Sequence, residues 1–365
     1  MRYSIMLLVT AIFVLFIIAS VALYSIDFAR EYYSTGSNSN FFFKYIVYIS
    51  LSMILALLII FFLPERFIED KKYVWFFYII VLAMLVLPLY GPFSSYKNGA
   101  RRWIEVSGNT FQPSEIAKIF AIYFIAHYIK DKDNKEKLSS FWNGLMKPLL
   151  LISPILLLIF VEPDLSTTFV IFLTAVVMLY FGGTRFSHVL FLFVLIGLLF
   201  MFGIQFGLIH SYQIGRIKNY VSNEIPWQLE KAYEAIGNGG IIGSGPALGK
   251  YYIHVPQAES DFILATIGES FGYLGIIIVI LSYLAIVTSL IKISDEIDNE
   301  FIRYFIWGFS TLMMLQVVVN TGVVSGLFPI TGIPLPFVSY GGSSILAFSI
   351  GFGIIFSEIF IERGR

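Results

Sequence analysis

The stretch Ile5–Leu23, IMLLVTAIFVLFIIASVAL, decides which class of fold this chain adopts. It contains no charged residue, and a helix of this length, at 1.5 Å per residue, is long enough to cross a hydrocarbon layer of ~30 Å. It begins shortly after Met1 and Arg2 and so could be taken for a secretory signal, but it lacks a clean small-x-small cleavage site. We therefore interpret it as a retained first transmembrane helix.

Further apolar stretches follow along the whole chain, and Pro154 and Pro163 interrupt two of the weaker ones, which suggests helices sheltered by neighbouring helices. The sequence therefore predicts an all-α, polytopic integral membrane protein with about ten transmembrane helices in a single transmembrane domain, 1–365. The expected spans are residues 5–25, 41–63, 73–90, 113–129, 147–161, 165–182, 187–208, 263–292, 302–323 and 344–361.

The composition agrees with a membrane protein and excludes several kinds of function. Of 365 residues, 58% are hydrophobic and 13% charged, about half the charged fraction of a typical soluble domain. The formal net charge is zero, so nothing indicates a nucleic-acid partner. Cysteine is absent and the four histidines lack metal-ligand spacing, so a zinc enzyme is not expected.

Basic residues in the short loops predict the orientation, because such residues concentrate on the cytoplasmic side. They fall in loops 64–72 and 130–147 and at the C-terminus. With ten spans, both termini are then cytoplasmic, in the cytoplasmic (inner) membrane of a bacterium. Segments 91–112, 209–262 and 324–343 face outward, so we expect the chemistry there.

The segment 209–262 is the only long loop, and we expect it to carry part of the active site. Its stretch Gly237–Pro246, GNGGIIGSGP, is dense in glycine. Composition alone favours a flexible solvent loop, whereas glycine also lets a backbone approach a ligand closely. No strand–loop–helix context indicates a nucleotide site. No repeat relates the two halves of the chain, which argues against an inverted-repeat transporter.

Glu115 and Lys118 lie three residues apart at the start of a predicted span, so they share one helix face and can pair. Pro113 and Glu115 also suit an ordinary helix start, and Lys118 could extend outward to the membrane surface. A pair facing a polar cavity would serve a structural and a functional role at once, because an ionisable group in a membrane requires a partner or a function.

Two further sites carry carboxylates near predicted helix starts. In Glu162-Pro163-Asp164 the proline breaks the chain, and Asp164 is best explained as the N-cap of the next helix. Asp261 lies at the outer membrane boundary, where Ser260 could act as the cap and leave Asp261 free for chemistry. Desolvation there would raise the pKa of Asp261 toward the range useful to a general base.

Several cations fall on the predicted outer face, against the positive-inside tendency. Arg101 and Arg102, together with Arg216, suit a phosphate or pyrophosphate at headgroup level, because guanidinium groups bind such anions in a bidentate manner. The alternative is a salt-bridged surface loop in which Glu105 is a partner.

Five blocks in order along the chain resemble the SEDS family of bacterial cell-wall polymerases, the group that contains RodA and FtsW. They are Asn98–Ile104 (NGARRWI) with Phe111–Lys118 (FQPSEIAK), Glu162–Leu165 (EPDL), Ser260–Ile263 (SDFI), Asn320–Gly322 (NTG), and Leu327–Phe337 (LFPITGIPLPF) with Ser339–Ser344 (SYGGSS).

The resemblance implies a peptidoglycan glycosyltransferase that polymerises lipid II, the lipid-linked disaccharide-peptide, on the outer face of the membrane. It also implies a complex with a class B penicillin-binding protein, a single-pass transpeptidase. Asp261 is then the catalytic residue, and Glu115 and Lys118 line the central cavity. We also assign Ser260, Arg101, Arg102 and Arg216 to this cavity or to substrate binding, with Asp261 and Glu115 expected to open onto the same cavity.

Two positions depart from the family pattern: relatives commonly have Leu-Pro-Glu where this chain has Val255-Pro256-Gln257, and paired glutamates where it has Glu269-Ser270. The second departure puts the role of position 270 in doubt. The stretch Gly249–Tyr252 is more similar to division-type than to elongation-type members.

The resulting hypothesis is that Asp261 accepts the proton of the acceptor sugar's 4-hydroxyl as this attacks the anomeric carbon opposite the lipid pyrophosphate, with inversion. Arg101, Arg102 or Arg216, alone or with a divalent cation (Mg or Mn), would stabilise the leaving group. A flippase for lipid-linked precursors, with Glu115 and Lys118 as a translocation pair, is the alternative. A scaffolding subunit, in which Asp261 tolerates substitution, is a third hypothesis.

Overall fold

The computed structural model describes residues 1–33, 40–62, 70–91, 94–97, 100–106, 108–205 and 225–364. In this part of the chain, each of the ten predicted spans lies on a helix. These helices are α1 (Arg2–Tyr33), α2 (Phe41–Phe62), α4 (Lys71–Tyr90), α5 (Pro113–Lys130), α7 (Lys147–Val161), α8 (Leu165–Phe181), α9 (Phe186–Gln205), α12 (Ile263–Glu296), α13 (Glu300–Val324) and α14 (Gly342–Gly364). Shorter elements are α6 (Lys132–Lys135), a π-helical turn (Trp142–Met146), α11 (Trp227–Gly239) and a 3₁₀ turn (Tyr252–His254).

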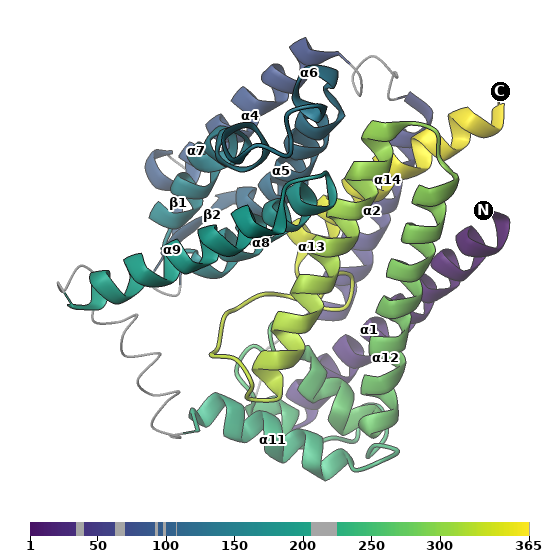
Figure 1. The fold of residues 1–365 in the computed structure, drawn as a ribbon. Coiled ribbons are helices and arrows are strands. Elements are labelled where there is room, and N and C mark those ends of the chain that lie inside the picture. The colour runs from purple at the N-terminus through teal and green to yellow at the C-terminus, as the bar shows by residue number, and fades with distance from the viewer. Residues whose placement is uncertain are drawn as a thin grey trace.

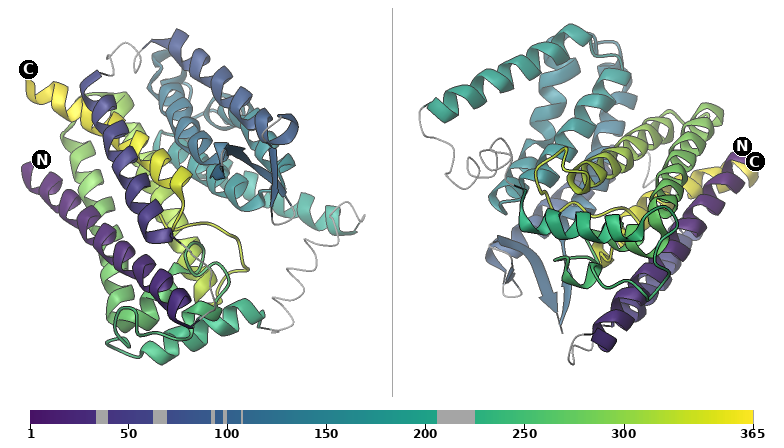
Figure 2. Two further views of the ribbon diagram at one scale, coloured as in Figure 1. Left: turned by 180° about the vertical axis from the view of Figure 1, so that it is seen from behind. Right: turned by 90° about the horizontal axis from the view of Figure 1, so that it is seen from below.

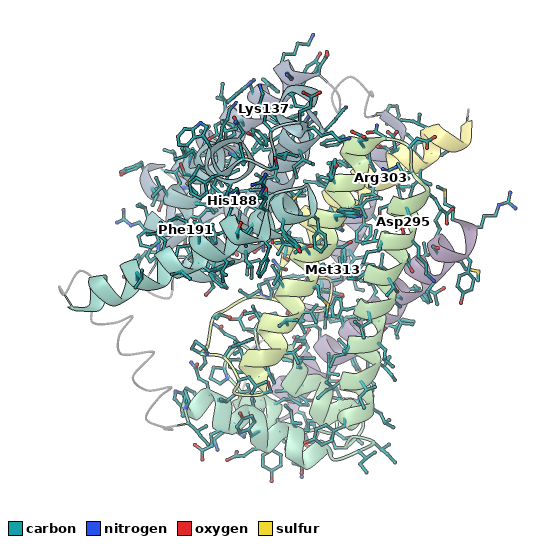
Figure 3. All side chains as sticks on the ribbon, viewed as in Figure 1. Lys137, His188, Phe191, Asp295, Arg303 and Met313 are labelled. Atoms are coloured by element: carbon teal, nitrogen blue, oxygen red, sulfur yellow. The ribbon has the colours of Figure 1, made fainter. Side chains whose placement is uncertain are left out.

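Seven helices among the described residues are long and apolar enough to cross a membrane, and α8 and α9 are shorter apolar helices. The helices form one bundle, in which α9 projects from one side and α11 lies across one end (Figures 1 and 2). Both termini lie toward the other end, where Lys137, Asp295 and Arg303 are also found (Figure 3). We refer to the two ends as the α11 end and the terminal end.

Helix α5 forms the centre of the bundle. Fourteen of its eighteen residues are buried, whereas only two of the twenty-two residues of α2 are. It packs against α4, α7, α8, α13 and α14. Its polar start therefore faces protein rather than lipid, as expected of a charged pair in a membrane helix.

The segment that joins α4 to α5 forms a small antiparallel sheet, which the sequence analysis did not predict. Its strands are β1 (Ser94–Lys97), β2 (Ala100–Val106) and β3 (Asn109–Phe111), in the order β1-β2-β3. Ile104 pairs with Ser94 on one side and with Phe111 on the other. The sheet thus holds β2 beside the start of α5.

The glycine-rich stretch is packed structure in the described part of the 209–262 segment, so the interpretation as a flexible solvent loop is wrong there. It lies against a break in α12 at Gly272, which has φ +68°. Four backbone hydrogen bonds join the two segments. They run from Ser244 N to Glu269 O (2.8 Å), Gly245 N to Ser270 O (3.1 Å), Tyr273 N to Gly240 O (2.9 Å) and Leu274 N to Ile241 O (3.2 Å).

Glycine is required at the break itself. A Cβ added to Gly272 would lie 2.2 Å from the Ile241 carbonyl oxygen, in addition to the strain of a positive φ. We therefore expect Gly272→Ala to cost about 1–3 kcal/mol of stability and to lower the thermal unfolding midpoint in detergent.

The matched control for this substitution is Gly197→Ala on α9, where an added Cβ meets no atom within 4 Å. Alanine is the better helix former, so this midpoint should stay level or rise slightly. Equal midpoints for the two variants would contradict the role of Gly272.

Candidate active site

Asp261 lies in the turn that leads into α12. Three consecutive carbonyl groups of this turn accept hydrogen bonds from the C-terminal part of the chain, which fixes the backbone on both sides of the carboxyl group. The donors are Tyr340 N to Glu259 O (2.8 Å), Ser339 Oγ to Ser260 O (2.6 Å) and Asn320 Nδ2 to Asp261 O (2.8 Å).

The segment between α13 and α14 lies beside the Asp261 side chain. Asn320 Nδ2 also donates to the Ile333 carbonyl (2.7 Å), so one buried amide joins this segment to the Asp261 turn. Gly332 has φ +75°, and a Cβ placed there would lie 3.3 Å from Asp261 Oδ2. The C-terminal blocks of the family resemblance, which include Asn320, Gly332 and Ser339, therefore support the Asp261 turn.

The surroundings of Asp261 favour its neutral form more than water does. Burial raises the pKa of this carboxyl to about 7, and the negative charges of Glu259 and Asp164 raise it as well, while Arg102 opposes them. Near neutral pH the group is thus poised to exchange a proton, as a general base must be.

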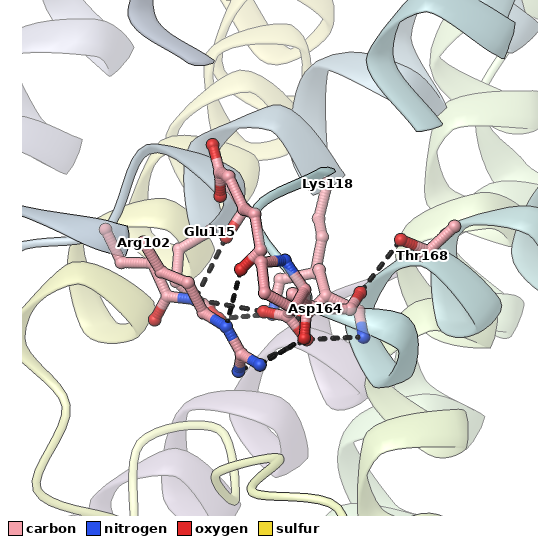
Figure 4. Close-up of polar contacts among 10 residues, drawn as sticks. Arg102, Glu115, Lys118, Asp164 and Thr168 are labelled. Atoms are coloured by element: carbon pink, nitrogen blue, oxygen red, sulfur yellow. Dashed lines mark hydrogen bonds and ion pairs between the residues drawn. The ribbon is translucent and has the colours of Figure 1, made fainter. Parts of the chain in front are cut away.

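Arg102 comes from β2 and holds the turn between α7 and α8 (Figure 4). Its Nε donates to the Glu162 carbonyl (3.0 Å), its Nη2 donates to the Pro163 carbonyl, and its Nη1 lies 3.8 Å from Asp164 Oδ1. Much of its hydrogen-bonding capacity is therefore directed at the protein, and its charge acts on the carboxylates around it.

Asp164 is the N-cap of α8, as the sequence predicts. Its Oδ1 accepts from the Thr167 amide (3.1 Å), and its Oδ2 accepts from the Thr167 hydroxyl (3.0 Å) and from Gln112 Nε2 (3.2 Å). Gln112 Nε2 also contacts Ser114 Oγ (3.0 Å) on α5. Asp164 thus links the start of α8 to the start of α5.

Glu162 is an acid whose burial the sequence analysis did not foresee. Its side chain is fully buried, and neither carboxyl oxygen has a hydrogen-bond partner among the described residues. Burial, and then the charge of Asp164, raise the pKa of Glu162 to about 8, so it is largely protonated at neutral pH.

The other two predicted arginines are not placed at this cluster. Arg101 follows the strand alternation to the face of β2 opposite Arg102, and it is exposed. Arg216 lies outside the described residues. Contact of either residue with a pyrophosphate stays a prediction.

Glu115 and Lys118 form the ion pair that their spacing predicts, with 2.7 Å between Oε1 and Nζ. Their side chains are 5% and 2% exposed, so the pair is enclosed by protein. The second carboxyl oxygen of Glu115 has no hydrogen-bond partner among the described residues. Figure 4 shows the pair beside Arg102 and Asp164.

A narrow gap in the packing, too small to hold a water molecule, lies beside Lys118. It is lined by α5, α8 and α13, with Thr174 and Leu312 opposite the lysine, and Asp261 is not among its lining residues. Gln112 joins Asp164, whose charge acts on Asp261, to Ser114, the residue before Glu115. A single cavity shared by Asp261 and Glu115 stays a prediction.

Two supporting contacts around the Asp261 turn have no clear signal in the sequence. Arg30 on α1 forms an ion pair with Glu259 (2.9 Å). The carboxylate of Glu269 is buried and accepts hydrogen bonds from consecutive backbone amides. They belong to Lys250 (2.7 Å), Tyr251 (3.0 and 3.1 Å) and Tyr252 (2.7 Å).

Fold and site together define a multi-pass helical membrane protein with a partly buried acid held at one end of its bundle. The family model FtsW/RodA/SpoVE, described as "Cell cycle protein", matches residues 5–360. This chain belongs to that family, as the five sequence blocks indicate.

Two relatives from this family are similar to the chain over about three quarters of its length. The probable peptidoglycan glycosyltransferase FtsW of Trichlorobacter lovleyi is 34% identical over 283 residues, which are 76% of this chain and 73% of the relative. Stage V sporulation protein E of Bacillus subtilis is 32% identical over 288 residues, 76% of each chain.

Two solved structures share the fold. One, from a study titled "Structural coordination of polymerization and crosslinking by a peptidoglycan synthase complex", has a TM-score of 0.77 at 23% identity and covers 95% of this chain and 96% of its own. The rod shape determining protein RodA of Thermus thermophilus has a TM-score of 0.66 at 23% identity and covers 98% and 96%.

The Glu115–Lys118 ion pair can be tested by measuring the stability of variants that lack one or both charges. Lys118→Met leaves a buried carboxylate without its cation, which typically costs about 3–5 kcal/mol. Adding Glu115→Gln removes that charge, so the double variant should unfold at a higher temperature in detergent than the Lys118→Met variant. Additive losses from the two single substitutions would contradict the pairing.

Proposed function

We propose that this chain is a peptidoglycan glycosyltransferase that polymerises lipid II into glycan strands at the outer face of the cytoplasmic membrane. Its family and its FtsW relatives support the enzyme class. The observation that carries the assignment of chemistry is Asp261, a partly buried carboxyl whose pKa is raised to about 7, on a backbone fixed by three hydrogen bonds.

In this reaction Asp261 takes the proton from the 4-hydroxyl of the acceptor sugar as the oxygen attacks the anomeric carbon of the donor. The lipid pyrophosphate leaves from the opposite face of that carbon, so the configuration inverts. Asp261 is protonated after the step and must release the proton to solvent before the next addition. A pKa near 7 suits both halves of this cycle.

Charge on the departing pyrophosphate needs cationic partners. Arg102 already binds the α7–α8 turn, so we assign it to positioning that turn and to the electrostatics of Asp261. Of the three arginines predicted to bind the leaving pyrophosphate, Arg101 and Arg216 therefore remain as candidates. Among the described residues, no group of three or more His, Asp or Glu side chains could hold a metal ion.

The proposed orientation places the α11 end outside and the terminal end, with both termini, in the cytoplasm. The positive-inside tendency supports this, since Lys137 and Arg303 lie at the terminal end. A class B penicillin-binding protein is the proposed partner, which would crosslink the strands. The solved neighbour described as a peptidoglycan synthase complex supports such an assembly. The FtsW relatives favour a division-type member.

Substitution of the proposed base is the direct test. Purified protein with its partner and lipid II should form long glycan strands on a gel, and Asp261→Asn should lower the rate by ~10²–10⁴. The control is Asp295→Asn, the same chemical change on an exposed residue at the far end of α12, which should polymerise normally. Normal strand formation by Asp261→Asn would overturn its role. Movement of fluorescent lipid II between leaflets without strands would favour the flippase.

The charges around Asp261 predict opposite shifts of the pH profile. The rate should rise as Asp261 ionises, with a midpoint near pH 7. Glu259→Gln removes a negative charge that raises the pKa, so its profile should move to lower pH. Arg102→Gln removes the opposing positive charge, so its profile should move to higher pH. Shifts of both profiles in the same direction would contradict this electrostatic account.

A further inference from the structure

The tip of the glycine-rich turn consists of two isoleucines that face away from the protein. Ile241 is 70% exposed and Ile242 is 77% exposed. No charged residue occurs between Glu234 and Lys250, so the tip stands within a long uncharged stretch. Adjacent, strongly exposed isoleucines on an ordered turn are unusual at a surface that faces water.

This isoleucine tip is held rigidly against α12. The Leu274 amide donates to the Ile241 carbonyl (3.2 Å), and the Tyr273 amide donates to that of Gly240 (2.9 Å). On the other side of the tip, the Ser244 amide donates a hydrogen bond to the Glu269 carbonyl of α12 (2.8 Å). The exposure of the tip is therefore imposed by the fold and does not arise from a free loop.

The position of the tip along α12 coincides with an expected edge of the hydrocarbon layer. Residues 273–291 contain no charge and end at Lys292. Nineteen helical residues span about 28 Å, close to the ~30 Å thickness of that layer. Tyr273 and Leu274 then lie at its outer boundary, where tyrosine is enriched.

The tip also continues the face of α12 that meets lipid. The exposed side chains of that face are Tyr273, Leu274, Ile277, Ile278 and Leu281. The Ile241 carbonyl is hydrogen-bonded to the Leu274 amide and the Ile241 side chain is exposed, so Ile241 adds apolar surface at the level of Leu274. A bilayer surrounds α12 whether or not a protein partner is bound, so lipid is the occupant that this continuity favours.

We propose that Ile241 and Ile242 insert into the outer leaflet as an interfacial anchor. The partner is the lipid surface itself, contacted by two apolar side chains at the boundary of the acyl chains and the headgroups. The anchor holds the described part of the 209–262 segment at a fixed height, and through the Glu269 and Ser270 carbonyls it fixes the start of α12 below Asp261.

The absence of cysteine makes a depth measurement straightforward. A nitroxide attached to Ile242→Cys in phosphatidylethanolamine–phosphatidylglycerol vesicles reports its contact with oxygen, which concentrates in lipid, and with a water-soluble nickel chelate. Ile277→Cys, on the exposed apolar face of α12, is the lipid control. Glu230→Cys, on the exposed face of α11, is the water control.

The ratio of oxygen to nickel accessibility at position 242 should be several-fold above that at 230 and close to that at 277. A ratio equal to that at 230 would overturn the proposal, since the tip would then face water. An immobilised label shielded from both reagents would also overturn it, because a protein surface would then cover the tip. Ile241→Cys provides a second, independent position, and the measurement requires no enzymatic activity.

Discussion

A bilayer offers no water to the polar groups of a broken helix, and the architecture of this protein follows from how it meets that constraint. Helix α12 breaks at Gly272, which frees amides and carbonyls close to the membrane boundary. The glycine-rich turn supplies partners for them on both sides of the break. The short helical segment ahead of the break is thereby stabilised, and it leads directly back to the Asp261 turn, whose carbonyls are in turn bonded by α13 and by the segment before α14.

Around that turn the protein maintains an imbalance of charge. The negative charges of Glu259 and Asp164 act on Asp261, while Arg102 provides the opposing positive charge. A cluster with more anions than cations keeps one carboxyl close to its protonation midpoint. Arg30 binds Glu259 from α1, so helices distant in sequence contribute to this balance. The site is therefore a property of the whole bundle more than of any single loop.

Much of this arrangement could be predicted from local patterns, and the remainder depends on distant contacts. Hydropathy placed the ten helical segments, the i to i+3 spacing predicted the Glu115–Lys118 pair, and Asp164 followed from helix-cap chemistry. The small sheet was missed because its strands are short and polar. The glycine turn was misjudged because composition does not reveal that α12 breaks beside it. The roles of Asn320 and Glu269 arise from pairings that no spacing rule encodes.

The burial of α5 has a consequence for how the chain is made. This helix carries a lysine and a glutamate and contacts mainly other helices, among them α8, α13 and α14, which are synthesised after it. When it first leaves the ribosome, α5 lacks the neighbours that later shield it from lipid. The newly made helix must therefore be shielded from lipid first by the insertion machinery or by α4. It is fully enclosed only after the C-terminal helices pack around it. Assembly of the bundle and insertion of its central helix are one coupled event.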